Sequence, residues 1–218
     1  MSVHSNFTLP DILLNREELY EGNLCHYFRV AEEAPNKNNG YHGLRHPYYV
    51  LYLCHLAALY YQDRLTKQEV RILFIAALMH DYGHLGGKAQ SDRENIGRAV
   101  VALRKYCLPI DRPYLPDIEN VIWATEYPHK DARLEPLCNE IIQDADLCQV
   151  FDTAWYTITI HGLGGELGLT PQQMLQGQAP FIKGIAFKTE WAETQFPPAV
   201  RLTKIAEAQD FITCYETP

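Results

Sequence analysis

Apolar residues recur along this chain with the spacing of helices rather than of strands. Positions i, i+3, i+4 and i+7 are apolar through most of its length, which fills one face of a helix. Runs that alternate apolar and polar residues between hairpin turns do not occur. The pattern predicts helices over 17–33, 47–61, 67–82, 91–106, 117–125, 132–149, 150–161, 171–189 and 196–215. We expect an all-α fold, a compact helical bundle that forms one domain over residues 1–218.

Several of these helices have recognisable starts. Thr66 and Ser91 are each followed three residues later by a glutamate, Glu69 and Glu94, as in a capping box. Pro47 suits the first position of a helix, which would place His46 at the N-cap. The glycine-rich stretch 161–165 lacks the lysine of a phosphate-binding loop and is expected to be a helix–helix connection.

Composition limits the kind of ligand. The chain has 218 residues with 19 Lys and Arg against 27 Asp and Glu, a net charge of −8, which argues against wrapping of nucleic acid because neutralising phosphates needs a basic surface. The six scattered cysteines suggest reduced thiols. The N-terminus does not resemble a signal peptide, and the apolar stretch 72–79 is too short to span a membrane. We therefore expect a cytoplasmic protein, not bound to membranes, that acts on a small molecule; its oligomeric state is left open.

Histidines and carboxylates are concentrated at the ends of apolar segments. They are His42, His46, His80, Asp81, His84, Asp144 and Asp146. Taken alone, His80 and Asp81 are explained by a hydrogen-bonded core histidine and an aspartate that starts a turn. Together, imidazoles and carboxylates at the ends of apolar helices favour a mixed nitrogen and oxygen metal site. Asp81 is then the natural carboxylate to bridge two ions.

The order H…HD…D on an all-α chain resembles the HD superfamily of metal-dependent phosphohydrolases. The closest motifs are those of cyclic nucleotide phosphodiesterases. Residues 41–46 (YHGLRH) resemble the family's YHNxxH, 76–86 (AALMHDYGHLG) its AAxxHDxxHxG, 124–126 (ATE) its ATD, 145–147 (ADL) its last metal ligand, and 178–182 (QAPFI) its QxGFI. The similarity covers about 41–192. Gly43, Glu126 and Pro180 depart from the motifs, and the chain is shorter than the family's catalytic domain.

The resemblance implies a dinuclear metal centre. His46, His80, Asp81 and Asp146 would hold the first divalent ion, with zinc, iron or manganese suited to two imidazoles. Asp81 would bridge to a second ion that is otherwise mostly bound by water, which suits magnesium or manganese. A water between the two ions would become the hydroxide that attacks phosphorus.

The resemblance also implies roles around this centre. His42 would protonate the leaving oxygen, with Glu94 holding its imidazole, and His84 would lie near the second ion's waters or the phosphate. Gln178 would bind a purine on which Phe181 stacks, although the start of an ordinary amphipathic helix would also explain both residues. Phosphate contacts from Arg45, Lys88 and Arg93 compete with ordinary surface charge, and the roles of Glu126 and His129 are left open.

These expectations converge on a metal-dependent phosphohydrolase, favouring a phosphodiesterase that hydrolyses a cyclic or other nucleotide diester. An HD-type phosphomonoesterase or triphosphohydrolase acting on free nucleotides is the alternative. A second alternative, from another class, is a regulatory module that binds metal or nucleotide without turnover.

Overall fold

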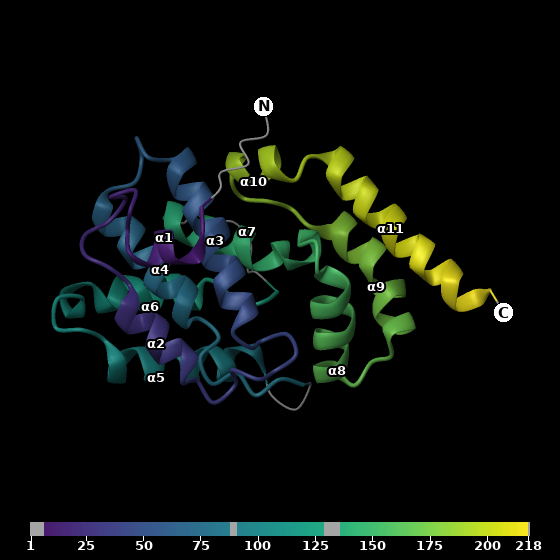
Figure 1. Ribbon diagram of the computed structural model, residues 1–218, viewed down its shortest axis with the longest axis horizontal. Coiled ribbons are helices and arrows are strands. Elements are labelled where there is room, and N and C mark those ends of the chain that lie inside the picture. Colours follow the sequence, from purple (N-terminus) through teal and green to yellow (C-terminus); the bar gives the residue numbers. More distant parts are fainter. Residues whose placement is uncertain (1–6, 88–90, 129–135, 218) are drawn as a thin grey trace.

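The structure, a computed structural model, describes residues 7–87, 91–128 and 136–217. Within these ranges it is helical and contains no strand, which confirms the all-α expectation (Figure 1). The elements are α1 (Leu9–Leu13), α2 (Cys25–Glu32), α3 (Arg45–Tyr60), α4 (Lys67–Met79), α5 (Asp92–Tyr106), η1 (Arg112–Tyr114), α6 (Leu115–Trp123), α7 (Leu137–Leu147), η2 (Cys148–Phe151), η3 (Tyr156–Leu163), α8 (Gly164–Leu167), α9 (Pro171–Gly184), α10 (Glu190–Gln195) and α11 (Pro198–Glu216).

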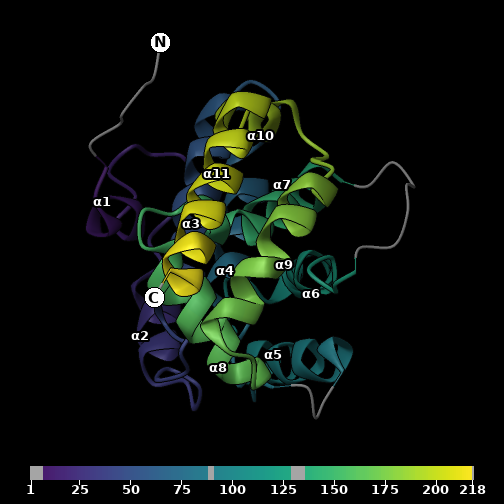
Figure 2. The same cartoon turned by 90° about the vertical axis from the view of Figure 1, so that its right-hand side faces the viewer.

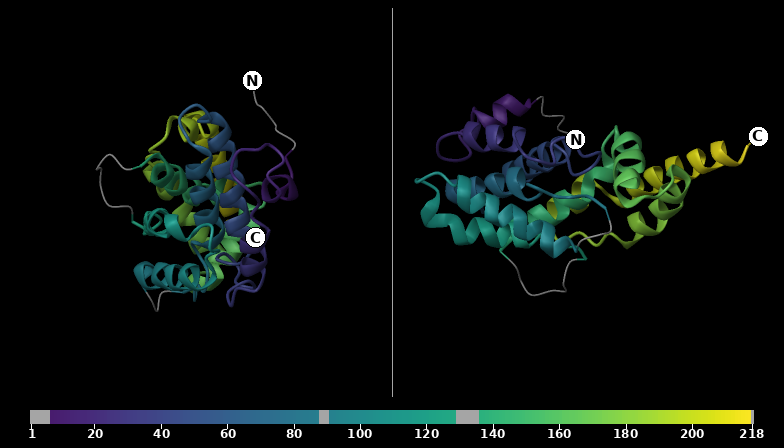
Figure 3. Two further views of the ribbon diagram at one scale, coloured as in Figure 1. Left: turned by 90° about the vertical axis from the view of Figure 1, so that its left-hand side faces the viewer. Right: turned by 90° about the horizontal axis from the view of Figure 1, so that it is seen from below.

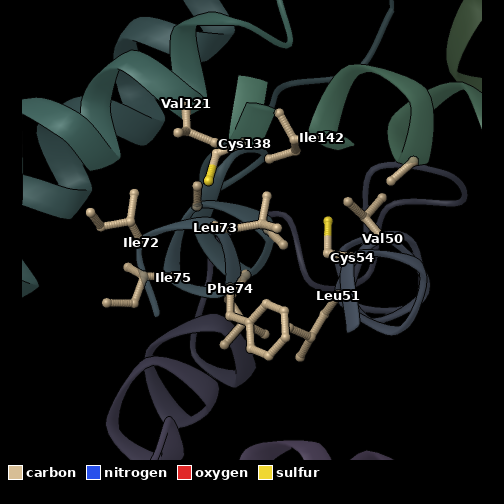
Figure 4. Packing of buried hydrophobic residues seen from close by; sticks show 14 of the residues in the cluster. Val50, Leu51, Cys54, Ile72, Leu73, Phe74, Ile75, Val121, Cys138 and Ile142 are labelled. Carbon is tan, nitrogen blue, oxygen red and sulfur yellow. The ribbon is translucent and has the colours of Figure 1, made fainter. Parts of the chain in front are cut away.

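Helix α4 lies at the centre of the main hydrophobic core. Every residue from Val70 to Met79 is buried, and all of them except Arg71 are apolar, as expected for a helix that is surrounded by others. Figure 4 shows Leu73 and Phe74 of α4 between side chains of α3, such as Leu51, and of α6 and α7. The predicted capping box is confirmed at the start of this helix, where the Thr66 hydroxyl accepts a hydrogen bond from the backbone of Glu69. The packing of α3, α6 and α7 against α4 brings together the ends of helices that are distant in sequence.

A second, smaller core joins the C-terminal elements. Trp155, Ile160, Leu175 and Ile182 are buried in it, and they come from η3, α9 and the segment before η3. In Figure 2 α8, α9 and α11 lie in front of α3 and α4, and Figure 3 shows α11 running outward from the rest of the molecule to the C-terminus. The two cores leave a cavity between them, which is described below.

The predicted helix over 17–33 is wrong in its first half. The chain forms α1 before this region, and α2 begins only at Cys25. Asn15 and Glu18 have φ of 54° and Gly22 has φ of 73°, a left-handed backbone that cannot continue a helix. Apolar spacing alone does not reveal such turns.

A buried arginine fixes this N-terminal segment. The guanidinium of Arg71 donates to both carboxylate oxygens of Asp111 at 2.6 and 2.8 Å, and it also donates to the backbone carbonyl of Asn23. The hydroxyl of Tyr27 donates to the same carboxylate at 2.8 Å. Burial opposes the charge of Arg71, but the contact with Asp111 outweighs it and raises the arginine pKa.

Removing this carboxylate should destabilise the fold strongly. We expect Asp111→Ala to lower the free energy of unfolding by about 3–5 kcal/mol, since it leaves a buried guanidinium without its counter-charge. Urea unfolding followed by circular dichroism measures the effect, with the exposed Asp63→Ala as control. Equal stability of the two variants would contradict the prediction.

The other boundaries differ in detail. α3 begins two residues earlier than predicted, so His46 lies in its first turn rather than at the N-cap. The expected helix over 196–215 is confirmed as α11, and the sequence did not predict the short helix α10 that precedes it. α9 ends at Gly184 rather than at 189. The expected loop at 161–165 is helical, because the π-helix η3 runs directly into α8.

Among the described residues, no helix is long and apolar enough to cross a membrane. All six cysteines lie in the described ranges and none forms a disulfide.

Candidate active site

Four residues from three parts of the chain meet where α3, α4 and α7 come together. His46 lies in the first turn of α3, His80 and Asp81 follow the last residue of α4, and Asp146 lies in the last turn of α7. The structure thus brings together the four residues that the resemblance implies as metal ligands. None of the four was identifiable alone, because each has an ordinary structural explanation.

The four side chains face a common point. His46 Nε2 lies 2.8 Å from Asp146 Oδ1 and 3.6 Å from Asp81 Oδ2. His80 Nε2 lies 3.2 Å from Asp81 Oδ2 and 3.6 Å from Asp146 Oδ1. A cation about 2.0–2.2 Å from each donor sets neighbouring donors roughly 3–3.5 Å apart by simple geometry. These separations therefore suit one ion held by two imidazoles and two carboxylates.

The surroundings of the two imidazoles fix which nitrogen faces the centre. His46 Nδ1 lies 3.2 Å from the amide oxygen of Gln149, and His80 Nδ1 lies 3.0 Å from the carbonyl oxygen of Ala77. In the neutral form of both rings, which a metal ligand requires, Nδ1 is thereby the donor and Nε2 carries the lone pair. His80 Nε2 and Asp81 Oδ2 are buried without a hydrogen-bond partner among the described residues. Buried polar atoms rarely lack a partner. A divalent cation is the partner that fits this set of donor atoms.

The charges of this cluster are mutually dependent. Burial opposes ionisation of Asp81 and Asp146, but the adjacent histidines outweigh it and lower the pKa of both carboxyls. Burial likewise opposes the charged form of His80, yet Asp81 and Asp146 raise its pKa well above the usual value. The protein therefore stabilises negative charge at the two aspartates, as a cation site requires.

The neighbouring carboxylate on α7 has a structural task. Asp144 accepts hydrogen bonds from the backbone N–H groups of Lys188 and Thr189 at 2.9 and 2.8 Å and from the Thr189 hydroxyl at 2.7 Å. Burial raises its pKa to about 6. Asp144 thus holds the segment before α10 on α7, while Asp146 belongs to the four-residue cluster.

His42 lies beside the metal cluster and is paired with a carboxylate. Its ring centre is 6.1 Å from that of His46, and its Nδ1 lies 2.6 Å from Oε2 of Glu166 on α8. Glu166 Oε1 also accepts from the backbone N–H groups of Tyr41 and His42 at 2.7 and 3.1 Å. Burial lowers the pKa of His42, but Asp81 and Glu166 outweigh it and raise that pKa. A protonated imidazole at this place can give a proton to a leaving group.

The prediction that Glu94 holds His42 is therefore corrected. Glu94 completes the capping box of α5, where its carboxylate accepts from the backbone N–H and the hydroxyl of Ser91 at 2.9 and 3.0 Å. That box was itself predicted, and it holds the exposed carboxylate of Glu94 at Ser91 through Oε2. Sequence reasoning missed Glu166 because the stretch before it was expected to be a loop.

His84 stacks on the ring of His42, and its place near a second ion stays a prediction. The two imidazoles stack with centres 3.6 Å apart and planes 14° apart. His84 Nε2 lies 3.0 Å from Nδ2 of Asn95, and its Nδ1 lies 3.0 Å from the backbone N–H of Gly86. Burial, with the nearby His42 adding to it, lowers the pKa of His84 to about 4. A neutral His84 can therefore stack on a protonated His42.

Asn36 joins the loop that carries His42 to the turn that carries Asp81. Its side-chain amide donates to the carbonyl oxygens of His42 and Asp81, at 2.9 Å for Asp81, and accepts from the backbone N–H of Gly83 at 2.7 Å. Position 43, where the resembled motif has asparagine, has no room for a side chain, since a Cβ on Gly43 would lie 2.4 Å from the carbonyl oxygen of Asn39. The amide that spans the two loops in this chain thus comes from residue 36.

We expect Asn36→Ala to lower kcat more than it raises KM, because the proton donor and the metal cluster would lose their fixed separation. A loss of roughly ten-fold or more in kcat should accompany unchanged metal content. The exposed neighbour Asn38 offers the matched control, Asn38→Ala. Steady-state kinetics together with metal analysis check both variants, and equal kcat values would refute the role of Asn36.

Two glycines let the segment that bears Glu166 approach the loop that bears His42. A Cβ on Gly162 of η3 would lie 2.3 Å from the carbonyl oxygen of Gly40, and one on Gly40 would lie 2.8 Å from Cα of Gly162. The two backbones are therefore in direct contact. This contact places α8 where Glu166 reaches His42.

A cavity of about 430 Å³ opens next to these groups, between the two cores. One wall carries His42, Asp81 and Asp146, with Asp92 and Thr125 beside them; the other is largely apolar and comes from η3, α8 and α9. Burial and the nearby Asp146 and Asp81 raise the pKa of Asp92, against the hydrogen bond from the backbone N–H of Tyr127. Sequence reasoning missed Asp92, a third carboxylate at this wall.

Gln178 and Phe181 both line this cavity from α9. Gln178 is buried, and its amide nitrogen donates to the carbonyl oxygen of Met174 at 3.1 Å, while its Oε1 has no partner among the described residues. Phe181 is half-buried and also packs on the smaller core. Their binding of a base remains a prediction.

Two of the predicted phosphate contacts, Arg45 and Arg93, do not line the cavity. Arg93 donates to Glu126 at 2.9 Å, and Arg45 is 59% exposed and 3.5 Å from Asp152. Lys88 and His129 lie outside the described residues.

Comparison with known families agrees with this geometry. The family model of the HD domain matches residues 43–150. This chain belongs to the HD-domain family. The match contains His46, His80, Asp81 and Asp146, so the cluster lies within the part that defines the family, whose members bind divalent metals and act as phosphohydrolases. It leaves out His42, Glu166, Gln178 and Phe181. No curated protein matches the chain.

Proposed function

We propose that this HD-domain protein is a phosphodiesterase that hydrolyses a cyclic or otherwise diester-linked nucleotide. The observation that carries the proposal is the His42–Glu166 pair, in which His42 lies beside the four-residue cluster and lines a largely apolar cavity. Divalent ions bound by His46, His80, Asp81 and Asp146 would acidify a water and neutralise charge on the phosphoryl oxygens. The oxygen-rich wall with Asp92 and Thr125 suits a second, mostly hydrated ion such as magnesium or manganese.

The remaining steps rest on this chain's own residues. The leaving oxygen of a diester needs a proton, and His42 is the group whose raised pKa keeps a proton available near neutral pH. Glu166 orients the ring and favours its charged form. Asn36 holds the His42 loop against the Asp81 turn.

The charge of the cavity favours a diester over a triphosphate. The described residues that line it include no lysine or arginine but three aspartates, Asp81, Asp92 and Asp146. A diester brings a single negative charge that the metal ions can balance. A nucleoside triphosphate brings several and would need basic side chains as well.

The test is a substrate panel with manganese-loaded protein. It compares 3′,5′-cyclic AMP, cyclic GMP, AMP, a nucleoside triphosphate, bis(p-nitrophenyl) phosphate and p-nitrophenyl phosphate. We expect the diesters to be hydrolysed and the monoesters and the triphosphate to be poor substrates. Faster hydrolysis of AMP or of the triphosphate than of the diesters would favour the alternative, a phosphomonoesterase or triphosphohydrolase. No turnover of any compound, with metal bound, would favour a regulatory module.

A further inference from the structure

The apolar side of the cavity contains a buried hydroxyl that the proposed chemistry does not use. Thr159 of η3 lines the cavity, is 5% exposed, and has an Oγ1 without a hydrogen-bond partner among the described residues. A threonine within a helix commonly bonds its hydroxyl to the carbonyl one turn back. In the π-helical turn Tyr156–Leu163 this hydroxyl does not do so. Buried hydroxyls without a partner are rare and call for an explanation.

A second polar atom without a partner lies at the same wall. Gln178 is 4% exposed, and its Oε1 has no partner while its nitrogen is bonded to Met174. Thr159 and Gln178 come from η3 and α9, which pack against each other. Other side chains of this wall, such as Leu163, Leu167 and Met174, are apolar and cannot form hydrogen bonds with them. Two polar atoms are thus left unsatisfied on one largely apolar wall, which also carries Gln173.

The cavity has the size of a small-molecule site, since such sites measure roughly 300–1,000 Å³. Its two sides differ in chemistry. The side with Asp81 and Asp146 suits a phosphoryl group with cations, while the other suits a flat ring with a polar edge. Ring atoms that donate and accept hydrogen bonds would satisfy the free atoms of Gln178 and Thr159.

We propose that Thr159 is a specificity-determining residue, whose hydroxyl hydrogen-bonds a polar edge atom of the substrate's ring beside Gln178. The inference rests on the proposed function and narrows its substrate class. The substrate is a phosphodiester that carries a nitrogen heterocycle with at least one N–H donor, because Gln178 Oε1 can only accept. The Thr159 hydroxyl can donate to a ring nitrogen or carbonyl, or accept from a second N–H.

Thr159→Val tests this, because valine keeps the shape and removes only the hydroxyl. With the cyclic nucleotide that the wild type hydrolyses best, we expect KM to rise about ten-fold, as for loss of one buried hydrogen bond. The kinetics of bis(p-nitrophenyl) phosphate, which has no such ring, should stay unchanged. Thr159→Ser, which keeps the hydroxyl, should stay within about two-fold of the wild type.

The KM for the nucleotide separates this role from plain core packing, because removal of a buried hydroxyl without a partner raises the melting temperature of the free protein in either case. If the hydroxyl were merely buried, Thr159→Val would raise the melting temperature and leave KM for the nucleotide unchanged, and that result overturns the inference. Calorimetric binding of cyclic AMP and cyclic GMP to the wild type and to Thr159→Val keeps the test independent of turnover. Binding without hydrolysis by the wild type, weakened in the variant, would refute the proposed enzyme yet support Thr159. No binding of either nucleotide overturns the inference as well.

Discussion

Asp146→Asn protein should fold but lose its bound metal and its phosphohydrolase activity, whereas Asp144→Asn, two residues earlier on α7, should keep both. The two substitutions make the same chemical change on one helix. Asp146 lies 2.8 and 3.6 Å from the imidazoles of His46 and His80, while Asp144 accepts its hydrogen bonds from Lys188 and Thr189. The pair of variants therefore separates a metal ligand from a buried structural carboxylate.

The expected effects differ in size and kind. Replacing groups that only support metal ligands already costs 10–100-fold in metal affinity, so loss of a charged ligand in Asp146→Asn should cost more than about 100-fold. Asp144→Asn should lower stability by about 1 kcal/mol, because one amide oxygen cannot accept all three of the present hydrogen bonds. Metal analysis of protein purified without chelator, activity with manganese and a thermal melt give the comparison. Full metal content in Asp146→Asn would remove Asp146 from the ligand set.

The meeting of His46, His80, Asp81 and Asp146 could be predicted because their order resembles the HD motif and because most of them lie in or at the ends of apolar helices. His80 and Asp81 follow a largely apolar helix, and Asp146 lies in another apolar helix. The sequence alone therefore indicated that these polar side chains would be buried. Packing of α3, α4 and α7 then brings these ends together. Apolar periodicity reports which helix faces are buried, and those faces determine this packing.

The proton-donor pair was harder to predict because it depends on a contact distant in sequence. Glu166 is 124 residues from His42, and it follows glycines that in most sequences indicate a loop. In this fold Gly162 permits backbone contact with Gly40, and the segment stays helical. Glu94 was the wrong choice since its capping box already uses its carboxylate. A side chain that already forms hydrogen bonds with its sequence neighbours is a poor candidate for a contact with a residue distant in sequence.

The same limit explains the errors in the fold. The first half of the predicted helix 17–33 has helical spacing. However, the guanidinium of Arg71 on α4 donates hydrogen bonds to backbone carbonyl oxygens of that segment. Its turn is fixed by a tertiary contact with a distant guanidinium, so local propensity is overridden. Capping boxes at Thr66 and Ser91 were predicted correctly because they involve only residues three apart.

His42→Ala should keep its metal but lose about 10²–10⁴-fold in turnover of a nucleotide diester, the usual contribution of a positioned general acid. The loss should be smaller for bis(p-nitrophenyl) phosphate, because nitrophenolate leaves without a proton. The exposed His161→Ala serves as control for a lost histidine. Should metal content fall together with activity, His42 would be a ligand instead.

Glu166→Gln tests how the charge of the acid is maintained. Burial opposes the protonated form of His42, and Asp81 and Glu166 together raise its pKa. The active form carries the proton, so activity is lost as pH rises through this pKa. Glutamine keeps a hydrogen-bonding group but removes the charge, which lowers the pKa of His42. The fall of kcat at high pH should therefore begin at a lower pH in Glu166→Gln than in the wild type. A pH profile identical to the wild type would mean that Glu166 only positions the imidazole, because its charge would then have no part in keeping His42 protonated.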